Sequence, residues 1–215
     1  MEDNTVFVRE YDEAEGLSYI DQRQILRYSG YPPGAGTVDE AVYGLLKEVV
    51  GELKGAFSYR VCYRRMPVTW EGGMPRFLLQ AESADLAKCL EGSTEAILFA
   101  ATIGLKIDRY IARYQRLSPA KALIAQGYGA ERVEALCNVF CDGIQVEVGK
   151  EGLKCTPRFS PGYGDLPLKT QKDVFALLDC SRKIGISLNE SLLMTPSKSV
   201  TAVFGLKKGC INEST

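Results

Sequence analysis

The spacing of apolar residues along the chain predicts six helices. The clearest follows the capping-box pattern of Thr37–Glu40 and places apolar side chains on one face at steps of three and four residues. Ser118 and Pro119 supply an N-cap and a first-turn proline for a long helix, which Gly127 and Gly129 weaken. The predicted helices cover residues 21–28, 37–54, 83–90, 106–117, 119–148 and 170–183.

Strands are predicted where apolar and aromatic residues alternate with polar ones or form short continuous runs. Phe57–Val68 alternates in this way, and the turn at Glu71–Met74 leads into a returning strand at Arg76–Gln80. Glu95–Thr102 is apolar throughout, which is typical of a buried strand. The remaining expectations are a loosely ordered arm over residues 1–18 and short strands near 191–194 and 199–204.

These elements do not follow one another as regular βαβ units. The pattern therefore predicts an α+β fold with a mainly antiparallel sheet and flanking helices, rather than a doubly wound parallel sheet. A length of 215 residues fits one domain, or one domain with an appended subdomain.

Bulk charge and composition exclude several classes of partner. The net charge is −1 and lysine and arginine are scattered, so the basic footprint of a nucleic-acid-binding protein is missing. The acidic N-terminus lacks the basic-then-apolar order of a signal peptide, and no apolar run approaches the length of a membrane span. We therefore expect a cytoplasmic protein with neither nucleic acid nor membrane as its partner.

The sequence contains no histidine, which excludes Ser–His and Cys–His nucleophiles and every histidine-ligated metal site. The seven cysteines form no CxxC pair, so we expect reduced structural thiols and no metal site. Chemistry must then come from a bound cofactor or from carboxylate, tyrosine, lysine and arginine groups.

The segment Thr156–Asp165 has the least ordinary composition. Prolines restrict the backbone on both sides of Arg158, and Gly162 and Gly164 allow conformations denied to other residues. An arginine on such a loop presents a planar fork that suits a carboxylate, and Tyr163 can hold its phenol in a cavity. A tight turn with a surface arginine is the plainer interpretation, and composition alone does not decide between the two.

Three segments together resemble the activation domain of cobalamin-dependent methionine synthase. They are Arg158–Asp165, the predicted helix 170–183 and Leu188–Ala202. In that family an Arg-x-x-x-Gly-Tyr loop precedes a helix, a Glu-Ser-x-x-Met-x-Pro segment and a Ser-Val-Ser-Gly-like strand. Leu98–Gly104 also resembles the family's apolar strand that ends in Thr-x-Gly, so the likeness covers about residues 95–205.

The resemblance implies a C-shaped α+β fold that binds S-adenosylmethionine in a shallow groove. Members of the family repair a methionine synthase whose cobalamin has become oxidised. An electron from flavodoxin or a similar donor, coupled to methyl transfer from S-adenosylmethionine, restores methylcobalamin. The partner enzyme supplies the cobalamin, so this chain would be an accessory component and not a complete enzyme. No protein nucleophile is required, which agrees with the missing histidine.

The resemblance also implies roles for individual residues. Arg158 would bind the methionine carboxylate, and Tyr163, the expected catalytic residue, would reach the axial water of the cobalt. Glu131 and Glu134, three residues apart on one helical face, would be carboxylates of the ligand site. The other expected ligand-contacting positions are Ser160, Gly162, Phe204 and Gly205.

The sequence departs from the family pattern in several places. Modules for homocysteine, methyltetrahydrofolate and cobalamin are absent, and Phe204 stands where the larger enzymes carry tyrosine. An N-terminal ligand-binding aspartate is not evident, and Glu10, Asp12 and Asp21 are the candidates to replace it.

We therefore divide the chain into an N-terminal helical and hairpin part, residues 1–94, and an activation-domain-like region, residues 95–215, within one compact domain. We expect it to act in trans on a methionine synthase that lacks its own activation domain. Two alternatives stay open: reactivation of another corrinoid methyltransferase, and a non-catalytic interaction module that senses S-adenosylmethionine or has lost the site.

Overall fold

An antiparallel sheet of five strands is the centre of the computed structural model, which describes residues 5–14, 16–31, 39–76 and 82–209. The strand order is β1-β2-β5-β9-β6, and every neighbouring pair is antiparallel. β1 and β2 come from the first part of the chain, whereas β5, β9 and β6 come from the second. The strands are β1 (Phe7–Tyr11), β2 (Tyr59–Pro67), β5 (Ser93–Thr102), β6 (Leu153–Cys155) and β9 (Ser199–Lys208).

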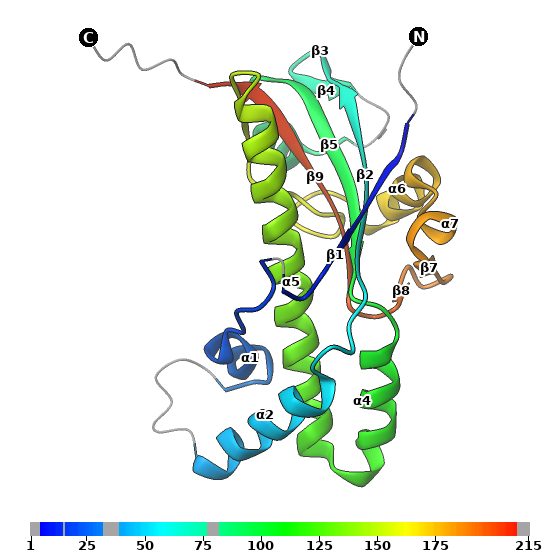
Figure 1. Cartoon of the computed structure of the whole chain (residues 1–215). Coiled ribbons are helices and arrows are strands. Elements are labelled where there is room, and N and C mark those ends of the chain that lie inside the picture. Colours follow the sequence, from blue (N-terminus) through cyan, green and yellow to red (C-terminus); the bar gives the residue numbers. More distant parts are fainter. Residues whose placement is uncertain (1–4, 15, 32–38, 77–81, 210–215) are drawn as a thin grey trace, which may run out of the picture.

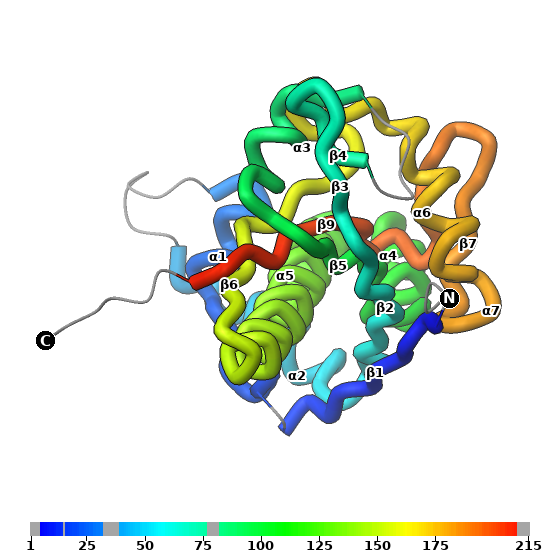
Figure 2. The backbone as a smooth tube through the Cα atoms, turned by 90° about the horizontal axis from the view of Figure 1, so that it is seen from above, coloured from blue at the N-terminus to red at the C-terminus, as the bar shows by residue number. Residues whose placement is uncertain are grey.

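The sheet curls around the long helix α5 (Pro119–Gly149), as Figure 2 shows. Phe140 of α5 packs against Phe99 of β5 and Phe204 of β9, with ring centroids 4.9 and 6.4 Å away. All three rings are almost completely buried. Because aromatic rings bury large apolar areas, this contact holds the helix against the sheet.

The first half of α5 extends beyond the sheet and is covered by three other helices (Figure 1). These are α1 (Gln22–Tyr28), α2 (Glu40–Leu53) and α4 (Lys106–Leu117). They belong to the same apolar core as the concave face of the sheet, so the helical end and the sheet share one core.

The opposite face of the sheet carries a second, smaller core. It is covered by α3 (Ala84–Cys89), α6 (Gln171–Leu178) and α7 (Cys180–Ile184), which lie on the far side of the sheet from α5 (Figure 2). The remaining elements are the 3₁₀ turn Leu168–Thr170 and two small hairpins, formed by β3 (Thr69–Glu71) with β4 (Met74–Arg76) and by β7 (Ser187–Leu188) with β8 (Met194–Thr195).

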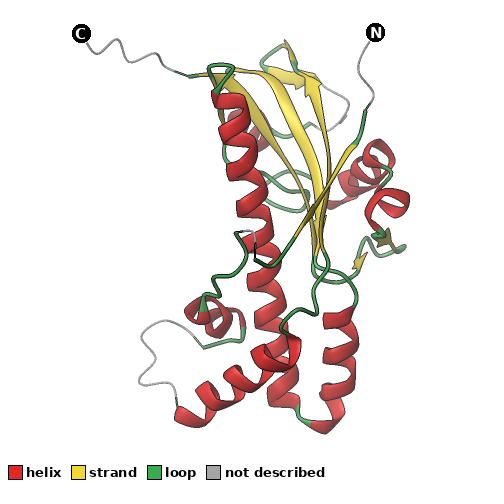
Figure 3. Cartoon of the chain, in the orientation of Figure 1, coloured by secondary structure: helices red, strands yellow, loops and turns green. Residues whose placement is uncertain are grey.

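The α+β class, the antiparallel sheet and the flanking helices are confirmed (Figure 3). The long helix runs without a break through Gly127 and Gly129, because both glycines lie where another chain segment packs closely against α5. Among the helices that the described residues form, none is both long enough and apolar enough to cross a membrane.

Several local predictions were wrong. The arm over residues 1–18 contains β1, whose backbone pairs with β2. The single helix expected over 170–183 is two helices, because Asp179 adopts a left-handed conformation (φ 48°, ψ 46°) between them. The strand expected at 191–194 is replaced by the short hairpin of β7 and β8.

Two further expectations fall partly on residues outside the described ranges. The capping box is one such expectation, because Thr37 lies outside the described residues. Within them, Asp39 caps α2, and its carboxylate accepts a hydrogen bond from the Ala41 amide at 3.0 Å. The returning strand expected at Arg76–Gln80 is described only to Arg76, where β4 ends.

Gly127 and Gly143 offer a matched test of this packing within α5. A Cβ at Gly127 would lie 2.2 Å from Ser29 Oγ and 2.4 Å from the Ile25 carbonyl oxygen of α1, whereas a Cβ at Gly143 meets only Arg9 Nη1 at 3.8 Å. Gly127→Ala should lower the free energy of unfolding by about 1–3 kcal/mol despite the better helix propensity of alanine. Gly143→Ala should raise it by about 0.5–1 kcal/mol. Urea unfolding measures both, and equal effects of the two substitutions would contradict the docking of α1 on Gly127.

Candidate functional site

The segment 156–165 lies along the edge of β9 that faces away from β5. Phe159 and Val203 exchange two backbone hydrogen bonds of 2.8 Å. Two residues further along β9, the Gly205 carbonyl accepts from the Thr156 amide at 2.9 Å, and its amide donates to the Thr156 hydroxyl at 2.8 Å. These contacts fix the backbone on both sides of Arg158.

The glycines of this segment are required by its shape. Gly162 (φ 92°) donates to the Leu166 carbonyl at 2.9 Å, and Tyr163 donates to the Ser160 carbonyl at 3.1 Å, which together close a tight turn. Gly164 (φ 52°) has no room for a side chain, because a Cβ would lie 2.2 Å from an Asp85 carboxylate oxygen. Both conformations are ones that L side chains rarely adopt.

Asp165 ties the end of the loop to the first turn of α3. Its carboxylate accepts from the Ser83 hydroxyl and from the Ala84 amide at 2.7 Å. The hydrogen bond from Ser83 lowers the pKa of this carboxyl below its ordinary value. The loop is thus held at three places, on β9, within its own turn and on α3.

A cavity of about 420 Å³ opens between this loop, α5, α6 and the beginning of β9. Glu134 borders it from α5, and Arg158, Ser160 and Tyr163 border it from the loop. Gly162 is not among the bordering residues, and its part is to shape the turn. Tyr163 is 70% exposed, so its phenol stands at the rim of the cavity and outside the packed core.

Two further hollows continue this cavity into a groove along α5. One of about 320 Å³ shares Arg158 and is bordered by Cys141 and Cys155. The other, of about 410 Å³, shares Glu134 and lies between α5 and the N-terminal segment, where Tyr19 borders it. Arg158 therefore stands between the main cavity and one neighbouring hollow, and Glu134 stands between the main cavity and the other.

Arg158 and Glu134 form an ion pair, with side chains 27% and 40% exposed. An exposed pair of this kind contributes only about 0–1 kcal/mol. The pair orients the Arg158 guanidinium. Because the pair is weak, a carboxylate from a ligand can replace Glu134 with little loss of free energy.

Glu131 has a different setting, although it lies one turn from Glu134 on α5. It is 5% exposed and accepts two hydrogen bonds of 2.5 Å from Arg132. It also accepts from the Asp21 amide at 3.2 Å. The Glu131 carboxylate is therefore occupied by contacts that hold the N-terminal segment. Glu131 forms part of the groove wall.

Phe204 and Gly205 lie beside the groove but offer it little. The Phe204 ring is 1% exposed and packs in the core, and Thr156 occupies both backbone polar groups of Gly205. A Cβ at Gly205 would lie 2.0 Å from Ser93 Oγ, so this glycine is explained by close packing. Phe204 borders only the hollow next to Arg158.

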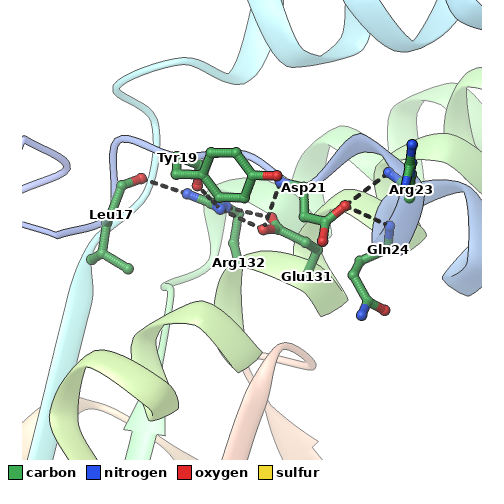
Figure 4. A network of polar contacts seen from close by, with 7 residues as sticks. All are labelled: Leu17, Tyr19, Asp21, Arg23, Gln24, Glu131 and Arg132. Carbon is green, nitrogen blue, oxygen red and sulfur yellow. Dashed lines mark hydrogen bonds and ion pairs between the residues drawn. The ribbon is translucent and has the colours of Figure 1, made fainter. Parts of the chain in front are cut away.

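The three N-terminal acidic candidates are separated in space. Asp21 borders the groove, but its carboxylate caps α1 by accepting from the Arg23 and Gln24 amides at 3.0 and 3.1 Å (Figure 4). Asp12 accepts from the Ala14 amide in a turn. Glu10 is exposed on β1, away from the three hollows.

Sequence reasoning missed Gln171, which borders the main cavity from the first position of α6. It is 6% exposed, and its carboxamide oxygen has no hydrogen-bond partner among the described residues. No sequence signal could have identified it, since a glutamine at the start of a helix is ordinary.

The chain is similar to known proteins in its sequence family and in its fold. The family model described as "Vitamin B12 dependent methionine synthase, activation domain" matches residues 84–209, more than half of the chain. The chain therefore belongs to this family. A search of curated proteins gives no significant match.

A crystal structure of the MetH reactivation domain bound to AdoHcy has the same fold, with a TM-score of 0.69. The two chains are 15% identical, and the match covers 94% of this chain and 78% of that one. At this identity the likeness shows the fold alone. It includes most of the N-terminal part, which the family model leaves unmatched.

The described cysteines form no disulfide, and Cys141 provides a test of their environment. Burial raises the pKa of the Cys141 thiol to about 11, against the opposing effect of Arg158. Since only the thiolate is alkylated, its reaction with iodoacetamide should accelerate about tenfold per pH unit from pH 7 to 10 without a plateau. Peptide mass spectrometry measures this rate, with guanidine-unfolded protein as the control. A plateau near pH 8.5 in the native protein would contradict the burial of this thiol.

Proposed function

We propose that this chain binds S-adenosylmethionine in the groove along α5 and supports the reductive methylation of cob(II)alamin held by a methionine synthase. The cobalamin and the electron come from other proteins, and the electron donor is of the flavodoxin type. The chain acts in trans on a synthase that lacks its own activation domain. Family membership and the shared fold with an AdoHcy-bound domain support this proposal.

The observation that carries the proposal is the setting of Arg158. Its side chain borders two of the three hollows, on a backbone fixed from both sides. A planar guanidinium matches a carboxylate through two parallel hydrogen bonds. The adjacent Glu134 carboxylate complements the ammonium and sulfonium charges of the same ligand.

Tyr163 supplies the group that faces the partner protein. Its phenol is exposed at the rim of the cavity, so it can donate a hydrogen bond to a group outside this chain while the ligand lies within. When bound, S-adenosylmethionine would supply the methyl group, and the neutral thioether S-adenosylhomocysteine would be the leaving group. The residues of this chain would bind and orient the ligand, and the exposed Tyr163 phenol would donate a hydrogen bond toward the partner's cobalamin.

Two measurements test the function as a whole. Isothermal titration of the chain with S-adenosylmethionine should show one binding site. A mixture with a reductant, S-adenosylmethionine and a methionine synthase lacking its activation domain should yield the visible spectrum of methylcobalamin. Binding without repair of any synthase would leave a sensor and remove the reactivation function, whereas absence of binding would remove both.

Arg158→Ala should weaken S-adenosylmethionine binding by about 1.5–3 kcal/mol, because a charge-assisted hydrogen bond is lost. Arg158→Lys should restore only part of the affinity, since an ammonium cannot reproduce the fork. Titration calorimetry measures both variants. Arg182→Ala is the matched control, because that side chain is 87% exposed on α7 and should leave the affinity unchanged. Unchanged affinity in folded Arg158→Ala protein would reject the site.

Tyr163→Phe should keep near-normal S-adenosylmethionine affinity but slow the appearance of methylcobalamin by one to two orders of magnitude, at about 1.4 kcal/mol per tenfold. The lost hydroxyl acts only in the complex with the cobalamin-bearing partner. Tyr43→Phe on α2, which does not border the groove, is the control. Repair at the wild-type rate would remove the role of Tyr163 while leaving the function in place.

A further inference from the structure

Helix α4, which stands at the outside of the helical end (Figure 1), carries four exposed cationic side chains on one face. At 100° per residue they fall within about 80° of one another around the helix axis, and they extend about 15 Å along it. Lysine and arginine are scattered along the sequence, but the helix gathers these four into one stripe, the basic face. Its members are Lys106, Arg109, Arg113 and Arg116.

The cations of the basic face form no hydrogen bond or ion pair with an acidic side chain among the described residues. Asp108 is the one acidic residue of α4, and its carboxylate accepts from the Ser197 amide at 3.1 Å. Glu52 of α2 also contacts α4, but its carboxylate accepts from two tyrosine hydroxyls there and pairs with Lys121. By contrast, several basic side chains elsewhere in the chain pair with carboxylates, namely Arg9, Arg65, Lys121, Arg132 and Arg158.

Exposed apolar side chains flank the basic face at both ends. Leu105 immediately precedes α4 and Leu117 ends it, and the two are 43% and 69% exposed. Both lie on the same side of the helix as the four cations, so the whole arc covers about 120°. The central part of a protein–protein interface is apolar and rich in arginine. The arc therefore has the composition of a docking surface.

Folding alone does not explain the basic face. Like charges three or four residues apart on a helix repel each other, and a lysine in the first turn opposes the helix dipole. Arg109 and Arg113 have a spacing of four, and Arg113 and Arg116 have a spacing of three. The stripe therefore lowers the stability of α4 for as long as nothing negative lies against it. An acidic surface docked there would remove this repulsion.

We propose that the basic face and its two flanking leucines dock on an acidic surface of the protein that this chain reactivates in trans. Opposite charge on the partner matches the unpaired cations, and apolar side chains on the partner match the leucines. That the partner is a methionine synthase rests on the proposed function.

A separate chain needs such a surface more than a fused domain does. Two domains on one chain meet at an effective concentration of about millimolar, whereas a chain acting in trans finds its client by diffusion. Charge complementarity raises the rate of such encounters by about 10- to 1,000-fold. The basic face and its leucines border none of the three hollows, so docking there leaves the groove open to its ligand.

Charge reversal tests this surface. Arg109→Glu combined with Arg113→Glu should weaken binding to a methionine synthase lacking its activation domain at least tenfold, mainly through slower association. Arg182→Glu combined with Lys183→Glu on α7 is the matched control, because it changes the net charge equally and should leave the affinity unchanged. Surface plasmon resonance measures both pairs. Raising the salt from about 0.05 M to about 0.5 M should remove most of the difference, since exposed charges are then screened.

Leu117→Gln tests the apolar flank without changing the charge. It should weaken binding to the same synthase severalfold at both salt concentrations, because the contact it removes is not electrostatic. It decides the matter if the charge-reversed protein does not fold by circular dichroism. Titration calorimetry should show unchanged S-adenosylmethionine affinity in every folded variant, since the arc lies outside the groove.

The outcomes separate this surface from the proposed function. Equal synthase affinity of the wild-type and the folded α4 variants, in a mixture that forms methylcobalamin, would overturn the docking surface and leave the function. Binding that charge reversal weakens, without methylcobalamin, would support the surface and remove the reactivation. Absence of both synthase binding and methylcobalamin would remove both. Loss of binding to an acidic flavodoxin or to heparin, with synthase binding intact, would give the face to another partner and overturn the inference.

Discussion

The pairing of β5 with β9 is the constraint on which the position of the groove depends. β5 is apolar on both faces, so α5 packs on one side of it and α3, α6 and α7 pack on the other. β9 is the next strand, and its outer edge is the place where the two helical layers and the loop 156–165 meet. A groove at that edge can be bordered by Glu134 from one layer and by Gln171 from the other.

The N-terminal wall of the groove depends on a buried ion pair. Arg132 and Glu131 are neighbours on α5, and neighbouring side chains point about 100° apart around a helix, so they do not ordinarily face each other. Here the Leu17 and Tyr19 carbonyls, each 2.6 Å from the guanidinium, draw Arg132 to the side where Glu131 lies. Burying both charges is costly, and these carbonyls offset part of the cost. The N-terminal segment that contains Leu17 and Tyr19 is therefore held in place by hydrogen bonds from the Arg132 guanidinium to its backbone. No sequence pattern encodes these contacts.

The sequence predicted features that depend on local spacing and missed those that depend on contacts between distant segments. The apolar run of β5 and the glycines of the turn are local, and each was expected. β1 was missed because its residues alternate weakly and are mostly exposed at an outer edge of the sheet. The break at Asp179 was missed because only packing on β2 and β5 separates α6 from α7. Gln171 was missed because the cavity that it borders forms only where α6, the loop 156–165 and the beginning of β9 come together.

Under the proposed function, the ion pair between Arg158 and Glu134 would give the groove a selectivity that an unpaired cation would lack. A simple carboxylate that takes the guanidinium leaves Glu134 without a partner, so one pair is exchanged for another and little is gained. A simple amine that takes Glu134 leaves Arg158 unpaired in the same way. A ligand that carries a carboxylate and an ammonium on neighbouring atoms satisfies both side chains at once and turns one ion pair into two. Because the original pair is partly exposed and weak, breaking it costs little. Under the proposed function, this arrangement would therefore favour α-amino acids over singly charged ions, because the ligand takes the place of each partner in the ion pair.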